Sequence, residues 1–277
     1  MDTSGPVAAV ALAERTAEGE EKLIAGFRLQ AGLTHSETLM PMLEAMFSLA
    51  RMERDAVDAV AVTSGPGSFT GLRIGVSAAK GLCFALEKPL VAVPTLEVLA
   101  YQMWGTDGIV CPMMDARRGQ VYTAAYRFVA TGDGAEQRQR FPHMEEVLSA
   151  RAVPVEELAT ELNKLCSDMH GAPADGQSLA EKRTPESSKP APSGQASFCP
   201  QLTLLGDGVP PYLDRMRELL TIPFTVAPLH RDRQSAEALA ALAFRRMDEG
   251  KTVDAASFSP EYLRPSQAER SLSAQKE

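Results

Sequence analysis

The fold of this chain is decided by residues 57–86, which read VDAVAVTSGPGSFTGLRIGVSAAKGLCFAL. The β-branched run of residues 57–63 predicts a buried strand. A turn rich in Gly and Pro follows, and residues 70–86 then predict a helix, whose first turn Ser68 or Thr70 can cap. This order of strand, tight turn and helix start is typical of α/β proteins.

The turn also presents backbone N–H groups and a helix N-terminus, the features that favour a bound anion. It matches neither of the two common phosphate-binding loops. No Gly-Lys-Ser/Thr follows at the Walker spacing, and the glycines do not form a GxGxxG pattern. Taken alone, the turn is therefore a weak phosphate signal.

Small residues mark the helix after the turn. Each of Gly71, Gly75 and Gly81 costs roughly 0.8–1 kcal/mol relative to Ala in a helix interior. Such a helix is favoured where another backbone has to come close. That backbone belongs either to the sheet of its own subdomain or to a helix of a second chain, and the pattern leaves both interpretations open.

Strand and helix candidates alternate along the rest of the chain, which supports the α/β class. Residues 36–51 contain an apolar stripe at helical spacing that begins at Leu39. Pro41 lies within the first turns, so the helix begins or bends near that residue. Further helices are predicted at 95–103, 154–165 and 235–248, and strands at 7–12, 23–30, 90–94, 110–114, 120–128 and 202–205.

We expect two subdomains, residues 1–103 and 104–230, with the helix 235–248 packing back on the body. Residues 166–200 are dense in Pro, Ser, Gly, Lys and Glu, so we expect a disordered surface insertion within the second subdomain. A polar tail covers residues 262–277.

The composition of the chain argues against unaided nucleic-acid binding, membrane insertion and secretion. The chain has 277 residues and a net charge of −8, without a long basic block, so unaided binding of nucleic acid is not expected. No apolar run approaches the ~20 residues that span a bilayer, and residues 1–6 lack a basic leader or an apolar signal core. The four cysteines are scattered, without a CxxC pair. We therefore expect a cytoplasmic protein without a membrane partner.

The motif SGPGSFTGLRIG at residues 64–75, continued by AKGL at 79–82, resembles the signature of the TsaB (YeaZ) family. Shorter motifs along nearly the whole chain, outside residues 166–200, agree with it in order. They are Asp2-Thr3-Ser4, His35-Ser36-Glu37, Asp115-Ala116-Arg117-Arg118, and Tyr262-Leu263-Arg264 followed by Ser266-Gln267-Ala268-Glu269.

The resemblance implies an actin-like ATPase (ASKHA, ribonuclease H-like) α/β fold with two similar subdomains facing a cleft. For a chain with these motifs, the resemblance also implies a function: a non-catalytic subunit that is required for threonylcarbamoyl transfer to adenosine 37 of ANN-decoding tRNAs. The partners implied are the transferase TsaD and the small ATPase TsaE, with tRNA bound only through the complex. ATP and Mg²⁺ are used by that complex, and no cofactor is expected in this chain itself. Without its partner, the chain is expected to form homodimers through the surface that would otherwise bind TsaD.

In the family the two subunits meet through helices of their first subdomains, here residues 36–51 and 70–86. The partner-binding residues expected on this basis are His35, Leu39, Leu43, Met46, Phe47, Gly71, Arg73, Ile74, Gly75 and Ala78. A charged side chain at Gly75 or Leu43 is accordingly expected to abolish association while leaving the chain folded. A vestigial nucleotide loop is expected from Asp2, Thr3, Ser4, Gly65, Gly67, Ser68 and Asp115.

One departure from the family concerns the N-terminal segment. The family has a hydrophobic strand of about half a dozen residues before Asp-Thr-Ser, whereas Met1 directly precedes Asp2 here. Either translation starts upstream or the strand is missing, and a missing central strand would leave neighbouring backbone groups unpaired.

Two other functions remain as alternatives: a stand-alone actin-fold enzyme that uses nucleotide, and a metallo-endopeptidase. The four histidines, His35, His143, His170 and His230, include no pair three or four residues apart, so no metal site of the HxxxH or HExxH kind is expected. No GxSxG nucleophile motif occurs either. We therefore expect no catalytic residue in this chain.

Overall fold

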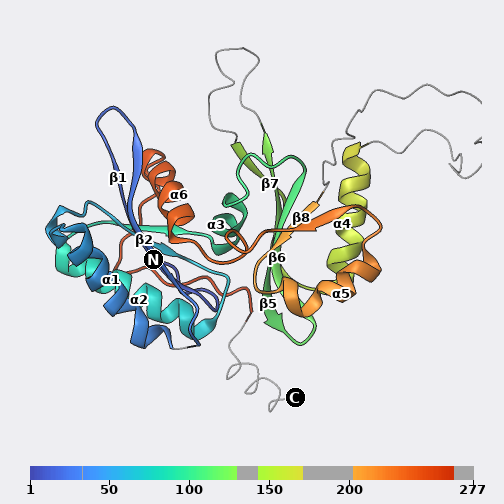
Figure 1. The fold of residues 1–277 in the computed structure, drawn as a ribbon, viewed down its shortest axis with the longest axis horizontal. Coiled ribbons are helices and arrows are strands. Elements are labelled where there is room, and N and C mark those ends of the chain that lie inside the picture. The colour runs from blue at the N-terminus through green and yellow to red at the C-terminus, as the bar shows by residue number, and fades with distance from the viewer. Residues whose placement is uncertain (33, 130–142, 171–201, 265–277) are drawn as a thin grey trace, which may run out of the picture.

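The computed structural model describes residues 1–32, 34–129, 143–170 and 202–264. Two α/β halves lie side by side (Figure 1). The first contains β1 (Ala8–Arg15), β2 (Glu21–Leu29), α1 (His35–Ala50), the short 3₁₀ helix η1 (Arg54–Ala56), β3 (Val60–Thr63), α2 (Phe69–Leu86), β4 (Leu90–Val93), α3 (Thr95–Tyr101) and the late helix α6 (Ala236–Asp248). The second contains β5 (Ile109–Arg117), β6 (Gln120–Val129), β7 (His143–Pro154), α4 (Val155–His170), β8 (Leu202–Leu205), α5 (Val209–Leu219) and β9 (Phe224–Val226).

In the first half, β1 pairs with β2 antiparallel and β3 pairs with β4 parallel. Helices α1 and α2 cover one face of these strands, where Val10 and Val62 are buried in one apolar cluster with residues of both helices. Helix α6 covers the opposite face, where Leu239 and Leu242 pack with Val91 and Val93 of β4. Strands β3 and β4 are therefore enclosed on both faces, as expected for apolar parallel strands.

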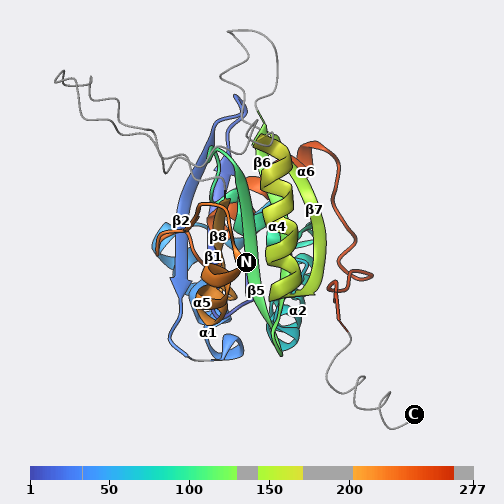
Figure 2. The ribbon, with the colours of Figure 1, turned by 90° about the vertical axis from the view of Figure 1, so that its right-hand side faces the viewer.

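The second half is built on one five-stranded sheet with the order β7-β6-β5-β8-β9. Helices α4 and α5 pack on one of its faces, and Figure 2 shows α4 in front of the sheet, running roughly along its strands. Helix α3 covers the other face, because its Leu96 and Leu99 are buried with Val110 and Met114 of β5. Since α3 follows β4 of the first half, it ties the two halves together.

Helix α2 agrees with the sequence prediction to within one residue. Ser68 is its N-cap, and the Ser68 Oγ accepts a hydrogen bond from the Gly71 backbone N–H at 3.2 Å. The helix ends at Glu87, whose φ of 54° is left-handed. Among the described residues, α2 is the one helix long and apolar enough to cross a membrane, a test that buried helices of globular proteins also pass.

The boundary of the predicted insertion was wrong at its N-terminal end. Helix α4 continues to His170, five residues beyond the predicted end at 165. The physical reason is the four-residue spacing of Leu158, Leu162 and Cys166, which are all buried in the core under α4. Residues 171–200 of the predicted insertion lie outside the described residues.

Strands β1 and β3 belong to separate sheets. Asp2 exchanges two backbone hydrogen bonds with Ala9, at 2.8 and 2.9 Å, and the Met1 amine donates to the Ala61 carbonyl at 2.8 Å. Residues 1 and 2 thus lie between the two strands. Beyond them is a cavity of about 650 Å³, lined by the two strands and α6 with many small side chains, among them Ala11, Ala13, Ala59, Ala61, Ala240 and Ala243.

An apolar extended segment of about five residues joined to the amino end of Met1 should stabilise the chain. In the register of Asp2 with Ala9, it would run opposite the remainder of β1 and supply backbone partners to both strands. Burial of its side chains should raise the free energy of unfolding by roughly 2–5 kcal/mol after the ordering entropy is subtracted. Urea unfolding measures the change, with a Gly-Ser segment of equal length as the control. Equal unfolding midpoints for the two extensions would contradict this account of the cavity.

Candidate functional site

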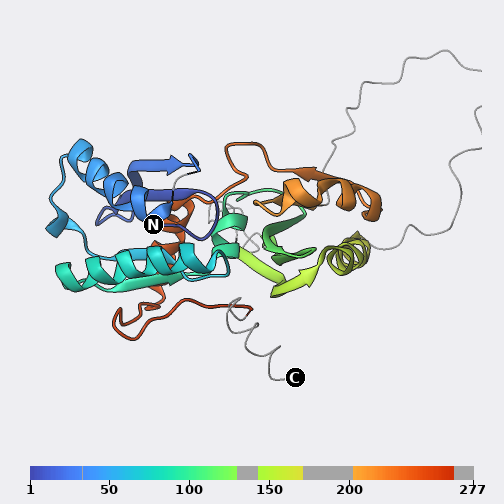
Figure 3. The ribbon, with the colours of Figure 1, turned by 90° about the horizontal axis from the view of Figure 1, so that it is seen from below.

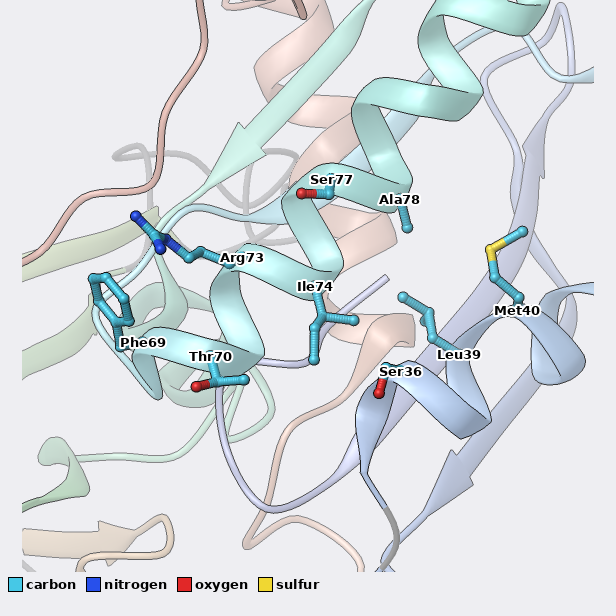
Figure 4. A pocket seen from close by; sticks show the side chains of 9 residues that line it. All are labelled: Ser36, Leu39, Met40, Phe69, Thr70, Arg73, Ile74, Ser77 and Ala78. Carbon is cyan, nitrogen blue, oxygen red and sulfur yellow. The ribbon is translucent and has the colours of Figure 1, made fainter.

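An open groove lies between the start of α1 and the first turns of α2, shown in Figure 4. Leu39 and Ile74 face one another across it, and Met40 lies at its rim with 52% of its surface exposed. Its lining is mostly apolar, with hydroxyl groups and one guanidinium at the edges: Ser36, Leu39, Met40, Phe69, Thr70, Arg73, Ile74, Ser77 and Ala78. An exposed apolar groove of this kind is suited to receive another protein.

The glycines of α2 accommodate this chain's own first loop. A Cβ at Gly71 would overlap the Thr3 carbonyl oxygen, and a Cβ at Gly75 would overlap the Thr3 Oγ1. Thr3 Oγ1 also donates to the Gly71 carbonyl at 2.7 Å. The expectation that Gly71 and Gly75 lie on the partner surface was therefore wrong, because the approaching backbone belongs to the same chain. Gly81, with nothing within 4 Å of a Cβ, is open.

Three residues of the predicted α1 stripe are also core rather than surface. Leu39, Leu43 and Met46 have 1%, 7% and 1% of their surface exposed and pack between α1, α2 and the strands. The expectation that a charge at Leu43 would leave the chain folded was wrong for the same reason. Only Leu39 of the three reaches the groove lining.

The remaining predicted residues divide between the groove wall and contacts outside it. Arg73 is exposed, and Ile74 and Ala78 are half-buried in its wall. Phe47 packs partly against the core under α1. The His35 ring Nε2 is 2.7 Å from the Gly5 carbonyl oxygen, so His35 ties the start of α1 to the first loop.

A second concave site, the cleft, lies between the two halves and has a volume of about 410 Å³. Loops from both halves line it: residues 4–6 and 66–69 from the first half, and residues 114–117, Tyr122 and Asp207 from the second, together with residues 262–264. Of the predicted nucleotide-loop residues, Ser4, Gly67, Ser68 and Asp115 belong to this lining. Asp2, Thr3 and Gly65 do not.

Asp2 lies behind the cleft with no exposed surface. Its Oδ1 accepts hydrogen bonds from the Ser4 N–H, the Ser4 hydroxyl and the Thr63 hydroxyl, at 2.9, 2.6 and 3.0 Å. Burial raises the pKa of Asp2, and the hydrogen bonds from Ser4 and Thr63 oppose that rise. The Asp2 side chain thus holds the first loop in place, under the turn that begins α2.

The two carboxylates of the cleft differ in their surroundings. Asp115 accepts from the Arg117 N–H at 2.8 Å and from the Tyr212 hydroxyl at 3.2 Å. Asp207 accepts a long bond, 3.4 Å, from the Asp115 N–H, and its Oδ1 has no hydrogen-bond partner among the described residues. Burial raises the pKa of Asp207, and Arg233 opposes the rise.

Two backbone donors of the turn beside the cleft are engaged within the chain. The Ser68 N–H already donates to the Ser4 carbonyl at 2.7 Å, and the Gly71 N–H donates to Ser68 Oγ. Asp115 is engaged by Arg117 and Tyr212, and residues 262–264 occupy one wall. Within the described residues, no group of three or more His, Cys, Asp or Glu side chains is placed to hold a metal ion.

Comparison with known proteins identifies the family. Residues 30–270 match the family model described as "TsaD: tRNA N6-adenosine threonylcarbamoyltransferase". The chain belongs to this family. Within it, the chain is 38% identical over 128 residues to the tRNA threonylcarbamoyladenosine biosynthesis protein TsaB of Bacillus subtilis, covering 46% of this chain and 54% of that protein. TsaB of Escherichia coli is 37% identical over 95 residues, covering 34% and 41%.

A solved structure of YeaZ from Pseudomonas aeruginosa matches over nearly the full length. It has a TM-score of 0.62 and 25% identity, covering 94% of this chain and 97% of that one. The predicted membership of the TsaB (YeaZ) family and the predicted actin-like α/β fold are thereby confirmed. In sequence, the chain spans about half the length of the curated TsaB relatives it matches.

Several groove residues of this TsaB-family chain were not predicted: Ser36, Met40, Phe69, Thr70 and Ser77. The sequence carried one signal for them, since Met40 is a large apolar residue next to the buried stripe and outside it. A stripe of core residues predicts which side of a helix is buried, and an apolar residue beside that stripe indicates where the helix remains exposed.

Replacing Asp207 by Asn should make the stability of the chain less dependent on pH. Because the pKa of Asp207 is higher in the folded state than its ordinary value of 3.8, the folded state binds this proton more tightly than the unfolded state. The contribution of Asp207 to the free energy of unfolding is therefore greatest below its ordinary pKa of 3.8, and it is lost as the pH rises through the raised pKa of the folded state.

The asparagine variant should have a flatter curve of unfolding free energy as the pH rises above the ordinary pKa of 3.8, and an equal or higher unfolding free energy at pH 7. Urea unfolding across this range measures the effect, with Asp214→Asn on the exposed face of α5 as the control. Parallel curves for the wild type and Asp207→Asn would contradict the prediction.

Proposed function

We propose that this chain is a non-catalytic subunit that binds the transferase TsaD and organises it for threonylcarbamoyl transfer to tRNA. The observation that carries the proposal is the open apolar groove between α1 and α2, on the two helices through which the family resemblance implies that the subunits meet. The similarity of the chain to proteins named for tRNA threonylcarbamoyladenosine biosynthesis supports the same proposal.

The proposed action is a shift of conformational populations in the partner. Docking on the groove stabilises those TsaD conformations that fit it, by the difference in interface free energy between the competent and other conformations. TsaE joins the pair, ATP and Mg²⁺ are used by the complex, and tRNA binds through it, in the cytoplasm. Alone, the chain covers the groove by forming a homodimer.

Co-migration with purified TsaD in size-exclusion chromatography tests the binding step. The proposal expects a shared peak that is absent when either protein is loaded alone, and a homodimer peak of this chain that disappears as TsaD is added. Separate elution at micromolar concentrations of both proteins would overturn it.

Catalysis by the chain itself is the second candidate, because transferase relatives are also similar to it. The tRNA N6-adenosine threonylcarbamoyltransferase of Rhizobium leguminosarum is 33% identical over 129 residues, covering 41% of this chain and 35% of that protein. Assay of the isolated chain for nucleotide turnover and threonylcarbamoyl transfer separates the two candidates. The sequence offers a metallo-endopeptidase no histidine pair, and metal analysis of the purified protein tests that alternative.

A further inference from the structure

The C-terminal strap, residues 261–264, contains the Tyr-Leu-Arg motif, whose three residues form one wall of the cleft. Figure 3 shows the segment before the strap running beside α2 toward the second half. The Lys80 Nζ of α2 holds this segment by donating a hydrogen bond to the Phe258 carbonyl at 2.9 Å.

The strap is anchored at both ends to different halves of the molecule. The Glu261 N–H donates to the Ser64 carbonyl at 2.7 Å, in the turn before α2. The Arg264 Nη1 donates to the Ala116 carbonyl at 2.9 Å, in the second half. At Gly65, whose φ is 121°, a Cβ would overlap the Glu261 carbonyl oxygen, so the strap and the turn pack backbone against backbone.

Between these anchors, the strap contacts the end of the groove. The Tyr262 ring lies against the Phe69 ring, with centroids 4.8 Å apart and planes inclined by 36°. On the same ring, the Arg73 guanidinium carbon lies 4.2 Å from the centroid. Phe69 therefore contacts both Tyr262 and Arg73, and it lines both the groove and the cleft.

We infer that Tyr262 is a positioning residue of the docking groove, which holds Phe69, and through it Arg73, in the orientation that a partner binds. Phe69 is the first residue of α2, where no preceding helical turn restricts its side chain. Aromatic and arginine side chains dominate binding energy at protein interfaces, and ordering them before binding lowers the entropic cost of association. The inference rests on the proposed function for the identity of the partner.

The Tyr262 ring acts by contact with Phe69, so the hydroxyl is dispensable. Replacing Tyr262 by Ala should weaken TsaD binding about 10-fold, and replacing it by Phe should restore the wild-type affinity. Phe69→Ala should weaken binding by at least the same factor, because it also removes the groove residue itself. The double variant should bind as Phe69→Ala does, because Tyr262 acts through Phe69.

A titration of TsaD with these variants, with Phe84→Ala as the control, measures the effect. Phe84 lies on the same helix, 87% exposed, and outside the groove lining. Wild-type affinity of Tyr262→Ala, or multiplied losses in the double variant, would overturn the inference.

Hydrogen exchange of the isolated chain separates this inference from the proposed function. Tyr262→Ala should accelerate exchange in residues 64–73, whereas Tyr262→Phe should not. If the wild type fails to bind TsaD while this acceleration occurs, the proposed partner is wrong and the positioning of Phe69 stands. Unchanged exchange in Tyr262→Ala would show that the strap does not order this segment.

Discussion

Replacing Met40 by Glu should lower the affinity of this chain for TsaD at least 100-fold, which corresponds to about 2.7 kcal/mol, while leaving the chain folded. Met40 lines the groove on α1 and is 52% exposed, so the glutamate is solvated in the free chain. On docking, its carboxylate would lose water within an apolar interface without an opposite charge, which is strongly unfavourable. Calorimetric titration into TsaD measures the loss.

Phe84→Glu is the matched control, because it places the same charge on an exposed apolar position of α2 outside the groove. It should bind TsaD as the wild type does, and circular dichroism should show both variants folded. Wild-type affinity of Met40→Glu, or an equal loss in Phe84→Glu, would place the interface on another surface.

Replacing Gly75 by Glu should unfold the chain or make it insoluble, rather than selectively remove partner binding. A Cβ at this position already overlaps Thr3 Oγ1, and the carboxylate would be buried beneath the first loop. We expect a loss of at least about 3 kcal/mol in the free energy of unfolding, from overpacking together with an unpaired buried charge. Even Gly75→Ala should cost roughly 1–3 kcal/mol.

Gly81→Ala on the same helix provides the control for helix propensity. Nothing lies within 4 Å of a Cβ at Gly81, so this change should stabilise the chain by about 0.8–1 kcal/mol. Urea unfolding compares the three variants. A Gly75→Ala variant with the wild-type midpoint would show that Thr3 does not pack on α2 as described.

The elements that the sequence predicted well are those with local signals at their ends. Helix α2 has a capping Ser68 after a Gly/Pro turn, and β3 is a β-branched run that stops at this turn. The residues themselves favour these boundaries, whatever else the chain contacts.

The elements that the sequence analysis missed depend on partners elsewhere in the chain. Strand β7 reads HMEEVLSARAVP, which lacks clear alternation, and it forms because β6 pairs along it. Helix α5 has Pro210 and Pro211 in its first turn, after Val209. The two prolines suggest a break, although proline is well tolerated at this place in a helix.

The candidate site shows the same limit. The family resemblance implied that α1 and α2 form the partner surface. It did not predict which small residues of α2 face the partner and which face this chain's own first loop. Thr3 lies 68 residues before Gly71 in the sequence, and no pattern within the helix indicates which backbone comes close to it. The same holds for Tyr262 and Phe69, which meet only because the strap crosses the turn before α2.

The central claim is that this chain acts by docking on TsaD through the groove between α1 and α2. The most direct measurement is threonylcarbamoyladenosine formation on tRNA by TsaD and TsaE, with this chain omitted, added as wild type, or added as Met40→Glu. The account predicts modification only with the wild-type chain, and recovery by Met40→Glu only at concentrations raised about 100-fold. Full modification without this chain, or equal support by both versions, would contradict it.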